Sequence, residues 1–257
     1  MTSSELAPIR PAVFDGVPGL VAGFSTRQGG VSRPPFEALN LGLSTGDERA
    51  DVLENRRRLA EHVGFRPDAL AIAGQVHGAE VKRVDAPGLF PGYDGLVTRT
   101  KGLLLCISAA DCAAVLLADA EAGVVGACHA GWRGTVARIV EKTIEGMETE
   151  GGRPERLRAY VSPCISRDHF EVGPEVAAQF DAAFVHQTSD EEKPHVDLKA
   201  ALRDQLRQAG VPAHAIEVAR PCTFAEPASF FSYRAQAGRT GRMMGFIGLR
   251  EGERESG

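Results

Sequence analysis

The sequence predicts an α+β fold with mixed β-sheets, and two observations point to it. Short apolar runs typical of strands and segments with helical periodicity are both present, but they do not alternate strictly along the chain. Several near-continuous apolar runs also indicate strands that are covered on both faces. The 257 residues, 43% of them hydrophobic, are enough for a sizeable core. We therefore expect one domain over 1–257, with flexible ends at 1–15 and 251–257.

The first quarter of the chain predicts a strand, a long loop and a helix. Residues 19–25 are typical of a strand, and the Gly-, Ser- and Pro-rich segment 26–35 is too long for a plain hairpin connection. Long ordered loops in compact domains often carry function. We expect Asp47 to cap a helix over 48–62, where apolar residues recur at helical spacing.

The middle of the chain predicts strands. Glycine and proline residues break the segment 70–97 into short apolar runs, which favours strands and turns over helices. Three more continuous apolar runs, at 103–107, 115–118 and 124–128, indicate buried strands. A hairpin-sized connection joins the second and third of these runs, so we expect them to pair antiparallel.

The last part of the chain predicts helices mixed with further strands. We expect Thr135 to cap a helix that runs to about Met147, and a second helix over 173–184. Apolar residues at i, i+4 spacing over 198–209, followed by Gly210, predict a third helix. Strands are expected at 157–161, 216–219 and 242–249, the last two as a pair.

Composition and charge exclude several classes of function. The formal net charge of −5 gives the whole chain no electrostatic reason to bind nucleic acid or anionic membranes. No segment approaches the roughly 20 apolar residues that span a bilayer. The start of the sequence also lacks the basic-then-apolar order of a secretory signal. We expect a cytoplasmic protein with small-molecule partners, and the sequence leaves its oligomeric state open.

Cysteine usage argues against a disulfide framework. The chain has five cysteines, an odd number, and no C-x-x-C pair. Cys106, Cys128 and Cys164 lie in or beside apolar runs and are expected to be small buried hydrophobes. Cys112 differs because it follows an acidic residue and precedes a predicted strand.

Three short segments each place one metal-ligating side chain where an apolar stretch gives way to turn-forming residues. The three side chains are His77, Cys112 and His129. Two imidazoles and one thiolate suit zinc, and a three-ligand site leaves a fourth position open for water or substrate. The predicted hairpin would bring Cys112 and His129 to the same end. The pattern therefore favours an enzyme.

A larger set of short motifs supports this interpretation. They are TRQGGVS at 26–32, NLG at 40–42, ENR at 54–56, QVHG at 75–78, DGLVT at 94–98, ADC at 110–112, HAGWRG at 129–134, GPEV at 173–176, DL at 197–198, CT at 222–223, FFSYR at 230–234 and GR at 241–242. Together they resemble the YfiH family, also called the laccase-domain or peptidoglycan editing factor family. The resemblance implies a layered α/β/β/α fold, similar to the catalytic part of cytotoxic necrotizing factor toxins. It also implies metal ligands at His77, Cys112 and His129.

The same resemblance implies an activity. Family members split adenosine, inosine, guanosine or methylthioadenosine with phosphate, as purine nucleoside phosphorylases, and they deaminate adenosine. Zinc is the expected cofactor, with copper the less favoured metal. Zinc lowers the pKa of water toward roughly 7, which suits attack on the purine C6.

Phosphorolysis also requires groups that hold phosphate and nucleoside. The candidate binding residues are Arg27, Asn40, Arg133, Tyr233, Arg234 and Arg242. A surface ion pair is the alternative role for each arginine. Asp111 is a candidate catalytic residue that orients a ligand or transfers protons, or else caps its own turn. Phe230, Phe231 and Tyr233 either stack on a base or belong to the core.

Other functions use the same residues or need different ones. In the main alternative, Cys112 is a nucleophile with His129 or His77 as its base, and it hydrolyses an amide in a cell-wall precursor. Multicopper (laccase) oxidation is disfavoured, because such enzymes need His-x-His pairs and none of the seven histidines here are two residues apart. A binding module without catalytic activity is the remaining alternative.

Overall fold

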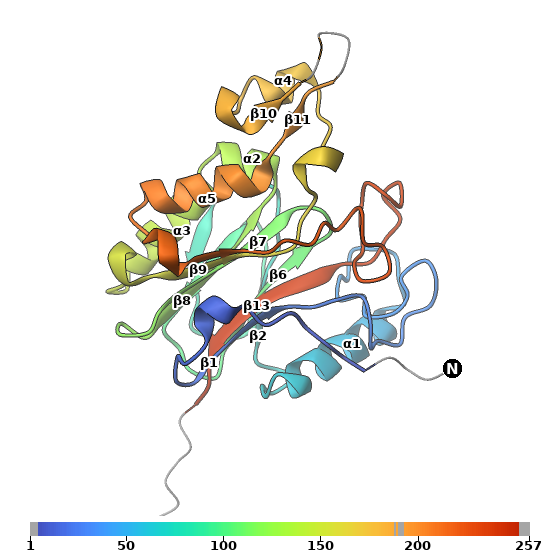
Figure 1. The fold of residues 1–257 in the computed structure, drawn as a ribbon. Helices are drawn as coiled ribbons and strands as arrows, with labels where there is room; N and C mark the ends of the chain where they lie inside the picture. The colour runs from blue at the N-terminus through green and yellow to red at the C-terminus, as the bar shows by residue number, and fades with distance from the viewer. Residues whose placement is uncertain (1–4, 188, 190–192, 252–257) are drawn as a thin grey trace, which may run out of the picture.

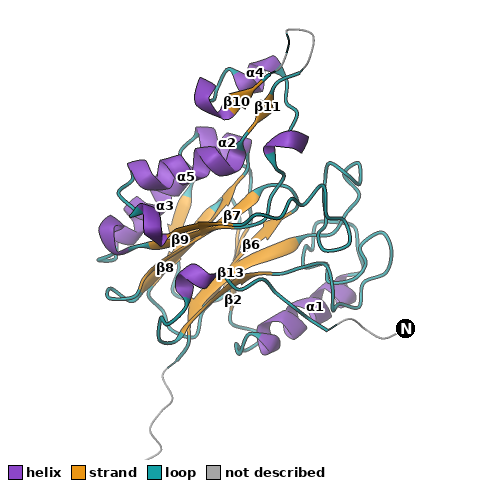
Figure 2. Ribbon diagram, viewed as in Figure 1, coloured by secondary structure: helices purple, strands orange, loops and turns teal. Residues whose placement is uncertain are grey.

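The computed structural model describes residues 5–187, 189 and 193–251. Two β-sheets pack face to face, and helices cover their outer faces, so that the molecule has four layers (Figures 1 and 2). Apolar clusters fill all three interfaces between these layers. The expected α+β class with mixed sheets in an α/β/β/α arrangement is confirmed.

The first sheet has the strand order β1-β13-β6-β2-β4. These strands are β1 (Leu20–Phe24), β13 (Met243–Leu249), β6 (Leu104–Ala109), β2 (Leu70–Ala73) and β4 (Gly88–Phe90). β13 pairs antiparallel with β1 and β6, whereas β2 is parallel to both of its neighbours. The helix α1 (Arg49–His62) covers the outer face, where Leu59 packs in one cluster with Leu104 and Phe246. This helix lies where helical spacing predicted one.

The second sheet has the strand order β12-β9-β7-β8-β5-β3. These strands are β12 (Ile216–Val218), β9 (Arg158–Val161), β7 (Ala113–Asp119), β8 (Val124–Ala130), β5 (Gly95–Thr98) and β3 (Val81–Arg83). β7 and β8 form the predicted antiparallel hairpin, with Ala114 opposite His129. The strands from the continuous apolar runs are buried because each sheet is covered on both faces.

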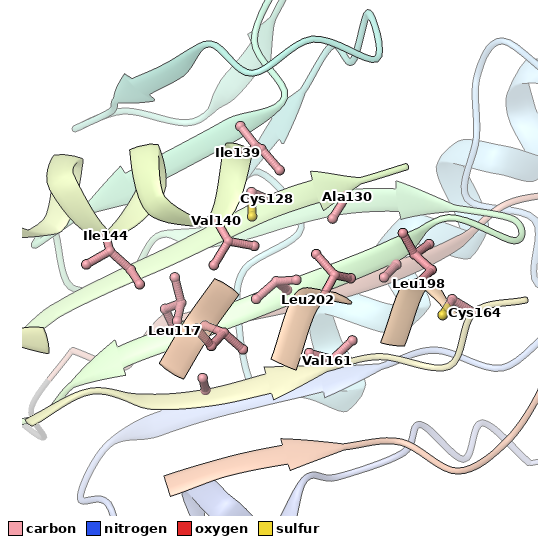
Figure 3. Packing of buried hydrophobic residues seen from close by; sticks show 14 of the residues in the cluster. Leu117, Cys128, Ala130, Ile139, Val140, Ile144, Val161, Cys164, Leu198 and Leu202 are labelled. Atoms are coloured by element: carbon pink, nitrogen blue, oxygen red, sulfur yellow. The ribbon is translucent and has the colours of Figure 1, made fainter. Parts of the chain in front are cut away.

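Two helices cover the outer face of the second sheet. They are α3 (Ile139–Thr149) and α5 (Leu198–Gln208). Figure 3 shows Ile144 of α3 and Leu202 of α5 directed toward the strand that carries Leu117. Fully burying a side chain of this size stabilises the fold by about 1.5–3 kcal/mol.

The helix expected from Thr135 onward begins earlier and is broken. α2 (Trp132–Val136) begins after Gly131, and α3 follows after Arg138, which has a left-handed backbone with φ of 61°. Thr135 therefore does not cap a helix. It lies inside α2, where its hydroxyl donates to the Gly131 carbonyl at 2.9 Å.

The helix expected over 173–184 is also interrupted. The segment forms α4 (Pro174–Ala177) and a separate 3-10 helix, Ala182–Phe184. Asp181 lies between them, and its carboxylate accepts the Ala183 N–H at 2.9 Å. This bond begins a new helical turn four residues after α4 ends.

Two further expectations are wrong. Glu48, not Asp47, is the residue before α1, and the Asp47 carboxylate instead accepts the side-chain amide of Asn40 at 2.9 Å. The last two predicted strands do not pair with each other. β12 joins β9 in the second sheet, while β13 lies inside the first, because the intervening segment crosses between the layers.

Short elements complete the described residues. They are β10 (Val185–His186), β11 (His195–Val196) and the 3-10 helices Ala12–Phe14, Pro154–Arg156, Arg167–His169 and Ala213–Ala215. Of the two ends expected to be flexible, residues 1–4 and 252–257 lie outside the described residues. Ile9 exchanges two backbone hydrogen bonds with Phe24, and Phe14 is buried. None of the helices in the described residues combines the length and the apolar composition that a bilayer span requires.

Candidate metal centre

Three side chains converge where the chain passes from the first sheet to the second. His77 follows β2 and Cys112 follows β6, each in a segment that leads into the other sheet, and His129 lies in β8. Their ligand atoms all lie within 4.8 Å of one another, and the described residues contain no other such group of three. His129 was expected after its strand but lies inside it, because the hairpin ladder extends to the pair Ala113 and Ala130.

The backbone near this cluster is strained in three places. Gln75, His77 and Asp111 have left-handed conformations, with φ of 56°, 59° and 82°. Each such residue costs about 1–3 kcal/mol, so neighbouring contacts must hold it in place. The Gln75 side-chain amide does so by donating to the Ser108 carbonyl and accepting the Ser108 N–H, both at 2.8 Å.

Asp94 connects two of the three ligands. Its carboxylate accepts the backbone N–H groups of Val76, His77 and Gly78 at 2.9, 3.1 and 2.8 Å. The same carboxylate is 2.9 Å from Nδ1 of His129, so it accepts that N–H and leaves Nε2 of His129 free to bind a metal. No role was predicted for Asp94, although it is the first residue of the DGLVT motif at 94–98. The feature of the sequence that could have indicated its role is its position, an acidic residue directly before a buried strand.

The electrostatics of the cluster favour a thiolate. Burial opposes charge on Cys112, but His129 and His77 outweigh burial and lower the pKa of the thiol to about 6. Burial likewise opposes charge on His129, but Cys112 and Asp94 raise the pKa of the imidazole above its ordinary value. Burial alone dominates at three other cysteines and raises the pKa of each thiol to about 12: Cys106, Cys128 and Cys164.

The geometry of the cluster fits a metal ion. Donors that share one zinc ion lie roughly 3–4 Å apart, so small side-chain adjustments would close this site around an ion. Gly131 leaves room for these donors. A Cβ at Gly131 would lie 2.8 Å from Sγ of Cys112 and 3.3 Å from Nδ1 of His77. His77 is exposed whereas His129 is buried, so the cluster is open on the His77 side.

The cluster lines a cavity of about 600 Å³, a volume typical of small-molecule sites. Four arginines line it as well: Arg56, Arg133, Arg234 and Arg242. Tyr233 also lines the cavity and is 54% exposed, and the Arg242 guanidinium lies over its ring at 5.6 Å. Phe230 and Phe231 are instead buried in the core between the two sheets.

Two of the predicted binding residues are not part of the cavity lining. The Arg27 guanidinium donates to the Glu37 and Pro227 carbonyls at 2.8 and 2.7 Å and so holds loops together. Asn40 is fully buried, and its side-chain oxygen accepts the backbone N–H of Arg242 at 2.8 Å. Asn40 therefore positions Arg242.

Asp111 connects loops beside the cluster. Its carboxylate accepts the hydroxyl of Thr223 at 2.7 Å and that of Ser232 at 3.0 Å. It also accepts the backbone N–H of Arg234 at 2.7 Å. These three bonds fix the turn that carries Cys112. Of the two carboxylates near the cluster, Asp94 is the one that contacts a ligand side chain.

Comparison with known proteins identifies the family. Residues 21–250 match the family described as multi-copper polyphenol oxidoreductase laccase. The chain belongs to this family. A purine nucleoside phosphorylase from Deinococcus radiodurans is 48% identical over 236 residues, 91% of each chain. The adenosine deaminase RL5, from an unknown prokaryotic organism, is 37% identical over 239 residues, 86% of this chain and 91% of its own.

A solved structure in this family supports the fold. The crystal structure of the Bacillus licheniformis protein YfiH superposes with a TM-score of 0.86 at 32% identity, covering 90% of this chain and 93% of that one. The predicted resemblance to the YfiH family is therefore confirmed. The family description mentions several copper ions. The described residues of this chain provide one group of three donors.

Proposed function

We propose that this chain is a zinc-dependent purine nucleoside phosphorylase that also deaminates adenosine. Its substrates would be adenosine, inosine, guanosine and methylthioadenosine. The observation that carries the proposal is a single cavity that contains both a three-ligand cluster and four arginines. The three-ligand cluster suits a reaction at the purine ring, and the arginines suit binding of phosphate. The activities named for the two relatives support both halves.

Zinc is the favoured metal for chemical reasons. Two imidazoles and a thiolate also suit copper in electron-transfer sites, which add a weak axial ligand, usually methionine. Among the described residues, those that line this cavity include no methionine. A cavity beside a three-ligand cluster is instead typical of catalytic zinc.

In this proposal, different residues of the cavity have different roles. A bound zinc ion would be a Lewis acid that lowers the pKa of water toward about 7 and so favours hydrolytic deamination at C6. Asp94 orients the His129 imidazole directly and holds the backbone of the turn that carries His77. The exposed Tyr233 ring would stack on the purine.

Phosphorolysis uses the cationic part of the same cavity. Arginines hold phosphate with one oxygen directed at C1′ of the ribose. That oxygen forms a bond to C1′ as the C1′–N9 bond breaks, and the electron pair of the broken bond leaves with the purine. The purine takes up the proton that hydrogen phosphate loses when it becomes the ester. The products are the free base and ribose 1-phosphate.

Product analysis tests the proposal. Purified protein is incubated with adenosine, with and without phosphate, and the products are separated by chromatography. We expect ribose 1-phosphate only when phosphate is present, and inosine in both samples. If neither product forms, the proposal is wrong.

One observation favours a second candidate function. Cys112, His129 and Asp94 form a series in which a thiol of lowered pKa lies beside an imidazole that a buried carboxylate orients. Thiol hydrolases use such a series, in which the thiolate attacks an amide carbonyl. The substrate would be a cell-wall precursor that carries serine in place of alanine.

Metal analysis combined with alkylation separates the two candidates, because zinc and nucleophilic attack compete for one sulfur. If one zinc ion per chain protects Cys112 from iodoacetamide, the phosphorylase is supported. If the active protein contains no zinc and one alkylation event at Cys112 abolishes amide hydrolysis, the hydrolase is supported.

A further inference from the structure

We propose that Arg56 and Arg242 form the phosphate subsite of the cavity. The inference rests on the proposed phosphorolysis and assigns its second substrate to two particular side chains. Arg56 was not among the residues that the sequence suggested, and Arg242 was one of several candidates.

Both guanidinium groups are partly buried, and among the described residues neither forms an ion pair with a carboxylate. Burial lowers the pKa of Arg56 and of Arg242, which means that each cation has lost part of its hydration. Among the described residues, neither has a carboxylate within 4.0 Å, although neighbouring Arg57 and Arg58 both pair with Glu54. A bound oxyanion would supply the missing negative charge.

Backbone contacts fix the positions of both side chains. Nε of Arg56 donates to the Leu41 carbonyl at 2.9 Å. Nη1 of Arg242 donates to the carbonyls of Thr240 and Gly241 at 3.0 and 2.9 Å. The other guanidinium N–H groups of both arginines have no protein acceptor within the described part of the chain. Donors held in this way lose little entropy when they bind an anion.

The segment 41–42 joins the two arginines. The Leu41 N–H donates to the Arg242 carbonyl at 3.0 Å, while the Leu41 carbonyl accepts from Arg56. The next residue, Gly42, lines the cavity, and a Cβ there would lie 2.7 Å from Cγ of Arg242. Glycine therefore lets this segment approach the Arg242 side chain closely.

The other two arginines of the cavity suit a phosphate subsite less well. Arg133 and Arg234 are exposed, so water and salt screen their charges. Arg133 lies over the Trp132 ring at 4.2 Å, and Arg234 donates to the Glu171 carbonyl at 3.0 Å. Arg242 also lies over a ring, that of Tyr233, at 5.6 Å, but Arg242 is partly buried. Burial lowers its pKa, while Tyr233, Cys112 and Asp111 raise it, which places Arg242 within electrostatic reach of the ligand cluster.

Steady-state kinetics with inosine test the assignment, because inosine is already deaminated and reports phosphorolysis alone. We expect Arg56→Gln and Arg242→Gln each to raise KM for phosphate at least about tenfold, since a hydrogen bond to a charged group contributes about 1.5–3 kcal/mol. Arg57→Gln is the matched control on the same helix, and its KM should change less than about twofold. If both variants fold and keep the wild-type KM for phosphate, the assignment is wrong.

Direct binding separates failure of this assignment from failure of the proposed function. Isothermal titration calorimetry measures inorganic phosphate binding to the wild-type protein and to both variants. If the wild type binds phosphate, the variants do not, and inosine is not cleaved, then the subsite stands and phosphorolysis fails. If the wild type binds adenosine monophosphate but not inorganic phosphate, the pair recognises a nucleotide ester and the assignment is overturned.

Discussion

The ligand cluster and the arginine pair lie on one cavity but are built in opposite ways. In the cluster, the Cys112 thiolate and the buried Asp94 carboxylate both contact the His129 imidazole, so opposite charges partly offset each other. Within the part of the chain that the structure describes, the hydrogen-bond acceptors of Arg56 and Arg242 are backbone carbonyls. The cluster is thus complete apart from a metal, whereas the pair requires an external anion. Some charges of a site are paired within the protein and others are left unpaired. This difference indicates which kind of ligand each part of the site binds.

Removal of one cluster ligand should have the largest effect. We expect His77→Ala to lower adenosine turnover by more than about 100-fold, since even residues that only orient ligands contribute about 10–100-fold to metal affinity or activity. Metal content, measured by mass spectrometry, should fall together with turnover. His214→Ala, an exposed histidine, is the matched control. Equal turnover by His77→Ala and the wild type would show that the cluster is not the reactive part of the cavity.

Substitution of the two carboxylates beside the cluster should separate a loss of metal affinity from a loss of stability. We expect Asp94→Asn to weaken metal affinity about 10–100-fold, because His129 and the His77 turn lose the charge that holds them. Asp111→Asn should instead lower the free energy of unfolding by about 1–3 kcal/mol, because its partners are loop groups. Metal titration and denaturant unfolding of both variants measure the two effects. A larger loss of metal affinity in Asp111→Asn would reverse the assignment.

A small substitution tests how tightly the cluster is packed. Gly131→Ala would place a Cβ 2.8 Å from Sγ of Cys112, so we expect a loss of about 1–3 kcal/mol in stability and weaker metal binding. The matched control is Gly146→Ala, since neither Gly131, with φ of −78°, nor Gly146 has a left-handed backbone, and a Cβ at Gly146 would come no closer than 3.3 Å to a neighbour, Cγ2 of Val97. Unfolding midpoints with and without zinc measure both variants. Metal binding by Gly131→Ala at wild-type strength would mean that the cluster has more room than these distances allow.

The lowered pKa of Cys112 predicts a gradual pH effect in protein stripped of metal. A pKa depressed by folding contributes stability that is present above the ordinary thiol value, about 8.5, and is lost as the pH falls through about 6. Alkylation of Cys112, followed by peptide mass spectrometry, should therefore have its midpoint near pH 6. Cys106 and Cys128 should stay unmodified over the same range, because burial raises the pKa of each to about 12. A midpoint near 8.5 for Cys112 would show that the imidazoles do not stabilise its thiolate.

Local patterns predicted much of the fold and one part of the cavity. Apolar runs located the central hairpin, and each ligand of the cluster lies beside turn-forming residues that mark its position in the sequence. Breaks caused by single residues were not predictable in this way. Arg138 adopts a left-handed backbone that interrupts a helical pattern, and Asp181 starts a new turn. In both cases tertiary contacts or side-chain hydrogen bonds override periodicity.

The arginine pair was harder to predict because nothing local distinguishes its members. Arg56 lies in a run of three arginines, of which Arg57 and Arg58 form ordinary helix-surface ion pairs. Only the packing of α1 against the segment that contains Leu41 turns Arg56 toward the cavity. Asp94 is similar, since its role depends on two segments that β-pairing brings together.

Zinc titration of metal-free protein tests the central claim most directly. Adenosine turnover is measured as zinc is added back to chelator-treated wild type and to Cys112→Ser. We predict that wild-type turnover is absent without metal, rises linearly and reaches a plateau at one zinc ion per chain, while Cys112→Ser stays inactive. Full turnover by the metal-free wild type, or a plateau that does not depend on Cys112, would contradict a metal centre at His77, Cys112 and His129.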